Sequence, residues 1–124
     1  MAVLFVAAGG ACGAVLRYLF GLVPIPGAFP VITLGINLAG ALAIGAISEA
    51  ALGEFGLSER SLLFLKTGFC GGFTTFSTFS LETIELMERG RAWMAALYAI
   101  VSVALCMAGV LMGKLAVRAL KAAV

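Results

Sequence analysis

The chain has 124 residues, of which 63% are hydrophobic and only 11% are charged. Soluble domains average about 45–50% apolar and about 25% charged residues, so this composition excludes a soluble globular protein. Eight basic and six acidic residues are too few and too scattered to form a nucleic-acid surface. The absence of histidine excludes Ser-His triads, histidine proton shuttles and histidine-ligated metal sites. We therefore expect a compact membrane protein whose main partner is the lipid bilayer.

Four apolar runs follow one another, each long enough to cross a bilayer as a helix of about 20 residues. All three prolines lie between the first and second runs, where they exclude a helix interior. Ser58-Glu59-Arg60-Ser61 is typical of a helix start, and Glu88-Arg89-Gly90-Arg91 forms a charged turn after the third run. One transmembrane domain over residues 1–124 is expected, with helices at about 3–23, 31–52, 61–87 and 92–114.

The third run differs from the others because a glycine pair, Gly71-Gly72, falls close to its middle. Glycine weakens a helix by about 1 kcal/mol relative to alanine. A broken helix survives in lipid only where its freed backbone groups are satisfied by protein, water or an ion. We expect this helix to be unwound at the pair, broken near 71–75, with freed carbonyls that can coordinate a cation. A close helix crossing at Gly68 and Gly72 is the alternative.

Hydroxyl and aromatic side chains surround the expected break. Five hydroxyl residues lie within seven positions, namely Thr74, Thr75, Ser77, Thr78 and Ser80. A phenylalanine stripe with helical spacing accompanies them, namely Phe73, Phe76 and Phe79. Aromatic rings have a positive edge, so ring edges beside hydroxyl donors would form a neutral lining that attracts a small anion.

Polar residues on two other runs have the spacing of single helix faces. Thr33 and Asn37 share a face of the second run, while Tyr98, Ser102 and Cys106 fall at i, i+4 and i+8 in the fourth. The Asn37 amide is the strongest neutral anion donor in the chain. Helix packing and interhelical hydrogen bonds are the alternative roles for these residues.

The charges bear on the transport mechanism. No carboxylate lies in the centre of an expected span, because the glutamates within the spans all lie toward helix ends, namely Glu49, Glu82, Glu85 and Glu88. Proton-coupled carriers rely on an intramembrane ionisable residue, so this distribution favours a passive conduit. GxxxG pairs predict close helix contacts at Gly9 and Gly13, Gly68 and Gly72, and Gly109 and Gly113. A bundle this small does not easily enclose a water-lined path, which favours an oligomer with a site at its interface.

The bias that sets membrane orientation is weak. One side of the expected bundle collects five basic residues, Arg60, Lys66, Lys114, Arg118 and Lys121. The other side collects three, Arg17, Arg89 and Arg91. Because Lys and Arg asymmetry sets orientation, insertion in both directions remains open.

Three motifs resemble the signature of the Fluc, or CrcB, family of fluoride channels: Gly9-Gly10-x-x-Gly13-Ala14-x-x-Arg17-Tyr18, Asn37-x-x-Gly40, and Gly68-Phe69-Cys70-Gly71-Gly72-Phe73-Thr74-Thr75-Phe76-Ser77-Thr78-Phe79. The last block is highly specific, and the resemblance covers nearly the whole chain. It implies an all-α membrane protein with four transmembrane helices, the third broken at mid-membrane, assembled as an antiparallel dual-topology homodimer. It also implies no enzyme activity, but passive fluoride export through two pores in a bacterial or archaeal plasma (inner) membrane.

The resemblance further implies roles for individual residues. A structural sodium ion at the dimer interface would be held by backbone carbonyls of Gly71 and Thr74 from each subunit. The fluoride pore would be lined by Asn37, Phe76 and Phe79, with a polar track drawn from Thr33, Ser77, Thr78, Tyr98 and Ser102. Arg17 would lie near a vestibule, and Cys106 stands where some relatives would carry a hydroxyl.

Two other functions remain open from the sequence. A small proton-coupled multidrug exporter has the same size and span number, but that class needs a carboxylate in its first helix. The first acidic residue here is Glu49. A membrane assembly subunit would have no conductance at all.

Overall fold

The computed structural model describes residues 1–52 and 56–123. The regular structure of these residues is entirely helical: α1 (Ala2–Gly21), α2 (Val31–Ala50), α3 (Glu59–Leu62), the π-helix η1 (Leu63–Cys70), α4 (Gly71–Phe73), α5 (Phe76–Glu88) and α6 (Ala92–Ala122). Three helices, α1, α2 and α6, are long and apolar enough to cross a membrane. The segment from Glu59 to Glu88 is divided into shorter helices. The described part of the chain is thus all-helical, and its long apolar helices are those of a multi-pass membrane protein.

Local sequence signals set several helix ends. Ser58 is the N-cap of α3, and its Oγ accepts a hydrogen bond from the Ser61 amide at 3.2 Å, which confirms the predicted helix start. After α5, Gly90 has a positive φ of 73°, and the Arg91 amide donates to the Leu86 carbonyl at 2.9 Å. This is the glycine-dependent helix ending expected of the predicted charged turn, which is confirmed.

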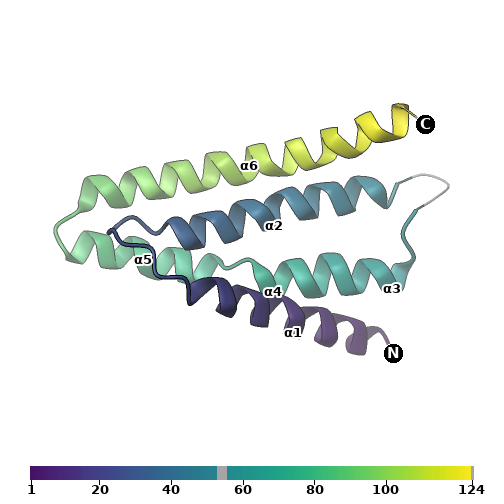
Figure 1. Cartoon of the computed structure of the whole chain (residues 1–124), viewed down its shortest axis with the longest axis horizontal. Helices are drawn as coiled ribbons and strands as arrows, with labels where there is room; N and C mark the ends of the chain where they lie inside the picture. Colours follow the sequence, from purple (N-terminus) through teal and green to yellow (C-terminus); the bar gives the residue numbers. More distant parts are fainter. Residues whose placement is uncertain (53–55, 124) are drawn as a thin grey trace.

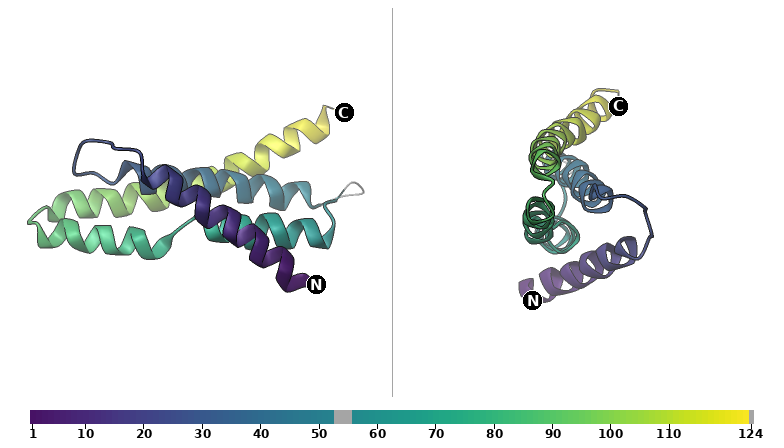
Figure 2. Two further views of the ribbon diagram at one scale, coloured as in Figure 1. Left: turned by 60° about the horizontal axis from the view of Figure 1, so that its bottom comes forward. Right: turned by 90° about the vertical axis from the view of Figure 1, so that its left-hand side faces the viewer.

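Two pairs of helices account for most of the packing. α2 and α6 lie side by side along the molecule, while α1 packs against η1 and α4 (Figure 1). Figure 2 shows that α1 crosses the other helices obliquely. Each close pair joins helices that are not consecutive in the sequence.

Glycines make the crossing of α1 with η1 and α4 close. A Cβ at Gly9 or Gly13 would collide with the backbone of the third segment, at the carbonyls of Phe64 and Phe69 respectively. In return, a Cβ at Gly68 or Gly72 would collide with the backbone of α1. The two GxxxG pairs therefore interlock, as small residues do between membrane helices.

Two extended residues separate α4 from α5. Thr74 has φ −76° and ψ 156°, and Thr75 has φ −149° and ψ 111°, so helical geometry stops after Phe73 and resumes at Phe76 (Figure 1). Gly71 itself is helical, with φ −65° and ψ −37°. The prediction that the glycine pair is unwound is therefore wrong. Gly72 stays helical where it contacts the backbone of α1 closely, whereas Thr75 finds a hydrogen-bond partner on another helix.

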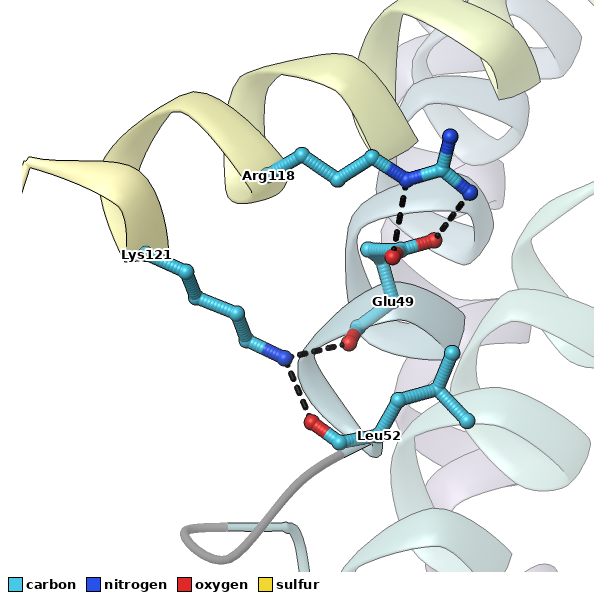
Figure 3. A network of polar contacts seen from close by, with 4 residues as sticks. All are labelled: Glu49, Leu52, Arg118 and Lys121. Carbon is cyan, nitrogen blue, oxygen red and sulfur yellow. Dashed lines mark hydrogen bonds and ion pairs between the residues drawn. The ribbon is translucent and has the colours of Figure 1, made fainter.

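The end of α2 is tied to the last turns of α6, which continue beyond residue 114 to Ala122. Arg118 donates two hydrogen bonds to the Glu49 carboxylate, and Lys121 donates to the carbonyls of Glu49 and Leu52 (Figure 3). The final carbonyls of a helix have no amide partner within it and favour a nearby cation. Lys121 supplies that cation at the end of α2.

Candidate functional site

A cavity of about 300 Å³ lies beside the break, between α2, α5 and α6. Its lining includes four of the predicted pore residues, Asn37, Phe76, Phe79 and Ser102, and also Cys106. Ser102 is only 5% exposed, and its hydroxyl has no hydrogen-bond partner among the described residues. A buried polar group without a partner costs about 1–3 kcal/mol. The Ser102 hydroxyl is therefore a buried donor, in a residue that lines the cavity, that no described residue uses.

Asn37 bonds both backbone groups of Thr75. Its Oδ1 accepts from the Thr75 amide at 2.8 Å, and its Nδ2 donates to the Thr75 carbonyl at 3.1 Å. The Thr75 side chain caps α5, because its Oγ1 accepts from the Thr78 amide at 3.2 Å. The extended backbone at Thr75 is thus satisfied without helical hydrogen bonds.

The same contacts divert the amides that would otherwise occupy two carbonyls. In a continuous α-helix the Thr75 amide bonds the Gly71 carbonyl, and the Thr78 amide bonds the Thr74 carbonyl. Here the first donates to Asn37 and the second to the Thr75 hydroxyl. Gly71 is exposed, and an added Cβ there would meet no atom within 4 Å. Both carbonyl oxygens are therefore available to a hard cation, which prefers oxygen ligands.

The described residues contain no group of three or more His, Cys, Asp or Glu side chains that could hold a metal ion. Backbone carbonyl and hydroxyl oxygens are other ligands that a hard cation accepts. The residues predicted for sodium, Gly71 and Thr74, are of that kind. The Thr74 hydroxyl is engaged elsewhere, because it donates to the Cys70 carbonyl at 2.8 Å.

A second polar cluster centres on Glu82. Its carboxylate accepts from the Thr33 hydroxyl at 2.7 Å and from the fully buried Tyr98 hydroxyl at 2.7 Å. In the sequence Glu82 lies toward the end of the third run, and it is not among the predicted site residues. The structure puts it within α5, between two predicted site residues from α2 and α6. Its spacing from Thr75 and Thr78, at i, i+3 and i+7 of one helix face, was the signal that could have found it.

A second cavity, of about 530 Å³, lies on the α1 side of the break. Its polar lining includes Arg17, Thr33, Thr75, Thr78 and Glu82, and Thr75 also lines the first cavity. Arg17 is anchored to the third segment, since its Nε donates to the Gly72 carbonyl at 3.1 Å. Seven of the nine predicted pore and vestibule residues line one of these two cavities, which share Thr75, whereas Ser77 and Tyr98 line neither.

Two predicted pore residues after the break are exposed in the single chain. Phe76 is 77% exposed, with its ring centroid 5.4 Å from that of Phe79. Ser77 is exposed as well, and its Oγ lies 3.4 Å from the Thr75 hydroxyl. The Phe79 ring is packed inward, 5.2 Å from the ring of Tyr98. The first turn of α5 therefore carries an aromatic ring and a hydroxyl on its exposed face, Phe76 and Ser77, and a second ring, Phe79, on its packed face.

The family model described as CrcB-like protein, Camphor Resistance (CrcB), matches residues 4–114. The chain belongs to the CrcB family. The matched range contains every predicted site residue, together with Glu82.

Individual relatives of this CrcB protein match along most of their length. The chain is 47% identical over 120 residues to the fluoride-specific ion channel FluC of Rhizobium leguminosarum bv. trifolii, covering 94% of this chain and 96% of the relative. It is 48% identical over 121 residues to FluC of Geobacter sulfurreducens, covering 95% and 98%. A shorter match to FluC of Chlorobaculum tepidum is 54% identical over 98 residues, covering 77% and 78%. These relatives are named as ion channels and not as enzymes.

Proposed function

We propose that this CrcB protein is a passive, fluoride-specific ion channel that exports cytoplasmic fluoride across a bacterial or archaeal inner membrane. The observation that carries the proposal is the neutral cavity beside the break, where the buried Ser102 hydroxyl has no partner among the described residues. The relatives named as fluoride-specific channels support the choice of ion. Four membrane spans are proposed, the third being the segment from Glu59 to Glu88.

The proposed pore replaces the water around the ion with neutral donors. Removing a small anion from water is costly unless hydrogen bonds compensate for its hydration. The unpartnered hydroxyl of Ser102 and the positive ring edges of Phe76 and Phe79 supply such compensation with neutral groups. The hydroxyls of Thr33 and Tyr98 donate to the Glu82 carboxylate instead. The proposed track consists of Thr33, Asn37, Ser77, Thr78, Tyr98 and Ser102. Arg17 lies in the proposed vestibule, the cavity on the α1 side.

A structural sodium ion is part of the proposal. The Gly71 and Thr74 carbonyls are the proposed ligands, since the amides that would bond them in a helix donate elsewhere. Such an ion would supply fixed positive charge near the path of the anion, which lowers the cost of an anion within the membrane.

The proposed assembly is an antiparallel, dual-topology homodimer with two pores. It is supported by the exposure of Phe76, because a pore-lining ring that is 77% exposed needs a second surface to close the path. The weak charge bias of five basic residues against three is compatible with insertion in both orientations. The same interface would bring carbonyls from two copies to the sodium ion.

Flux from liposomes tests this function. Purified protein is reconstituted, and fluoride and chloride efflux are compared with and without a proton gradient. We expect rapid fluoride-selective efflux without a proton gradient, and its loss in Phe76→Ile. The matched variant Phe5→Ile, whose ring lies 6.0 Å from the Arg60 guanidinium and away from the cavity, should conduct normally.

Each alternative predicts a different result in that assay. Efflux that requires a proton gradient would indicate a small multidrug exporter with coupled transport. Wild-type protein that is folded but releases neither ion would indicate an assembly subunit. Equal fluoride and chloride efflux would contradict the proposed selectivity.

A further inference from the structure

The extended peptide at Thr75 is held by one side chain from another helix. Asn37 on α2 accepts from the Thr75 amide at 2.8 Å and donates to the Thr75 carbonyl at 3.1 Å, and we call this pair of bonds the amide clamp. Asn37 is the only Asn or Gln in the chain, so no other side chain offers an amide donor and acceptor together. The clamp joins residues separated by 38 positions.

Neighbouring residues of α2 are shaped to admit the break. Gly40 lies next to the Thr74 side chain, where an added Cβ would collide with the Thr74 methyl group. Gly40 therefore lets α2 approach the extended residues closely. Asn37, one turn earlier on α2, then reaches the Thr75 peptide.

The clamp decides which conformation the Thr75 peptide prefers. When Asn37 is present, a helical hydrogen bond to the Gly71 carbonyl is replaced by a bond of similar kind, so leaving the helix costs little. When Asn37 is absent, the extended peptide loses both partners within the membrane, where unsatisfied backbone groups are strongly disfavoured. A helical conformation at Thr75 then becomes favourable. In that conformation the Thr75 amide would bond the Gly71 carbonyl, and the side chains of Phe76 and Phe79 would change direction.

We propose that Asn37 is a positioning residue, which keeps Thr75 out of the helix and acts on permeation through the Thr75 backbone rather than mainly by donating to the ion. The effect on flux rests on the proposed function. The clamp itself is a property of the backbone and can be measured without flux.

The first test measures the backbone by NMR on full-length protein labelled at threonine. In Asn37→Ala we expect the Thr75 ¹³Cα shift to move toward helical values or its amide exchange to accelerate by about tenfold, the size expected for one lost buried hydrogen bond. The matched variant Ser48→Ala, on the same helix, should change neither. An unchanged shift and exchange rate at Thr75 in Asn37→Ala would overturn the clamp.

The second test separates positioning from direct contact with the ion. A backbone ester at Thr75, made with the α-hydroxy acid analogue of threonine, removes the amide donor and leaves the Asn37 side chain intact. We expect fluoride flux to fall by about tenfold or more relative to a matched ester at Thr83 in the interior of α5. Equal flux from the two esters, with flux lost only in Asn37→Ala, would overturn the proposal in favour of direct contact.

The two tests also separate this inference from the proposed function. Wild-type protein that conducts no fluoride would contradict the function, and the Thr75 shifts would still decide the clamp. Fluoride-selective flux with unchanged Thr75 shifts in Asn37→Ala would retain the function and reject the clamp.

Discussion

Arg118 holds the Glu49 carboxylate with two hydrogen bonds, from Nε at 2.9 Å and from Nη2 at 3.1 Å. The Glu49 side chain is 10% exposed, whereas the Arg118 side chain is 56% exposed. Water can solvate the Arg118 guanidinium but hardly reaches the Glu49 carboxylate. The carboxylate therefore relies on Arg118 for its hydrogen bonds. The pair links the ends of two helices that lie side by side.

Removing Arg118 should destabilise the protein more than neutralising Glu49. Arg118→Ala leaves a buried carboxylate without its two donors, whereas Glu49→Gln removes the charge and keeps an acceptor. We expect the midpoint of thermal unfolding in detergent, followed by circular dichroism, to fall in the order wild type, Glu49→Gln, Arg118→Ala. Arg91→Ala, at the exposed N-cap of α6, is the matched charge control and should unfold like wild type. Equal midpoints for Arg118→Ala and Arg91→Ala would refute this order.

Alanine at Gly13 should destabilise the crossing of α1 with the third segment. Its Cβ would lie 2.7 Å from the Phe73 amide nitrogen, and the backbone must move to admit it. Overpacking of this kind costs about 1–3 kcal/mol. SDS titration of detergent-solubilised protein measures the loss. Gly21→Ala, on the same helix with no atom within 4 Å, is the control, and identical titrations would show that the crossing tolerates a methyl group.

Removing the Tyr98 hydroxyl should weaken the Glu82 cluster. Tyr98→Phe deletes a hydrogen bond to a carboxylate in a fully buried position, which is worth about 1.5–3 kcal/mol. The expected result is a lower unfolding free energy, measured by chemical denaturation. Tyr18→Phe, at a side chain that is 67% exposed, removes the same atom at the surface and should have little effect. A Tyr98→Phe protein as stable as Tyr18→Phe would mean that the hydroxyl contributes nothing net.

The proposed sodium ion should resist removal. If carbonyls of Gly71 and Thr74 hold it at a buried interface, extensive dialysis against sodium-free buffer should leave sodium bound, as measured by mass spectrometry of the metal. The sodium-free buffer can contain potassium or choline, because exchange of the buried sodium ion with either cation would be slow. Complete loss of sodium without a change in circular dichroism would count against a structural cation.

Helix ends in this protein are predictable where their cause is local. Ser58 caps α3 with its own side chain, and Gly90 ends α5 with a positive φ, so neighbouring residues carry the whole signal. Gly9 and Gly13 likewise predict a close helix contact. They do not predict which helix is the partner, because the backbone that they contact belongs to a segment far along the chain.

The position of the break and the place of Glu82 were not predictable from local signals. The glycine pair points to Gly71, but the extended residues are Thr74 and Thr75, and Asn37 bonds the amide and carbonyl of Thr75. The environment of Glu82 depends on hydroxyls of Thr33 and Tyr98, which lie on two other helices. Both features follow from tertiary partners and not from propensity.

The interlocked glycines also constrain how the protein is made. Gly9 and Gly13 emerge from the ribosome well before Phe64 and Phe69, whose carbonyls they meet, and the whole of α2 is synthesised in between. α1 is therefore complete before the backbone that its glycine face contacts has been synthesised, and this contact can form only after the third segment has been made.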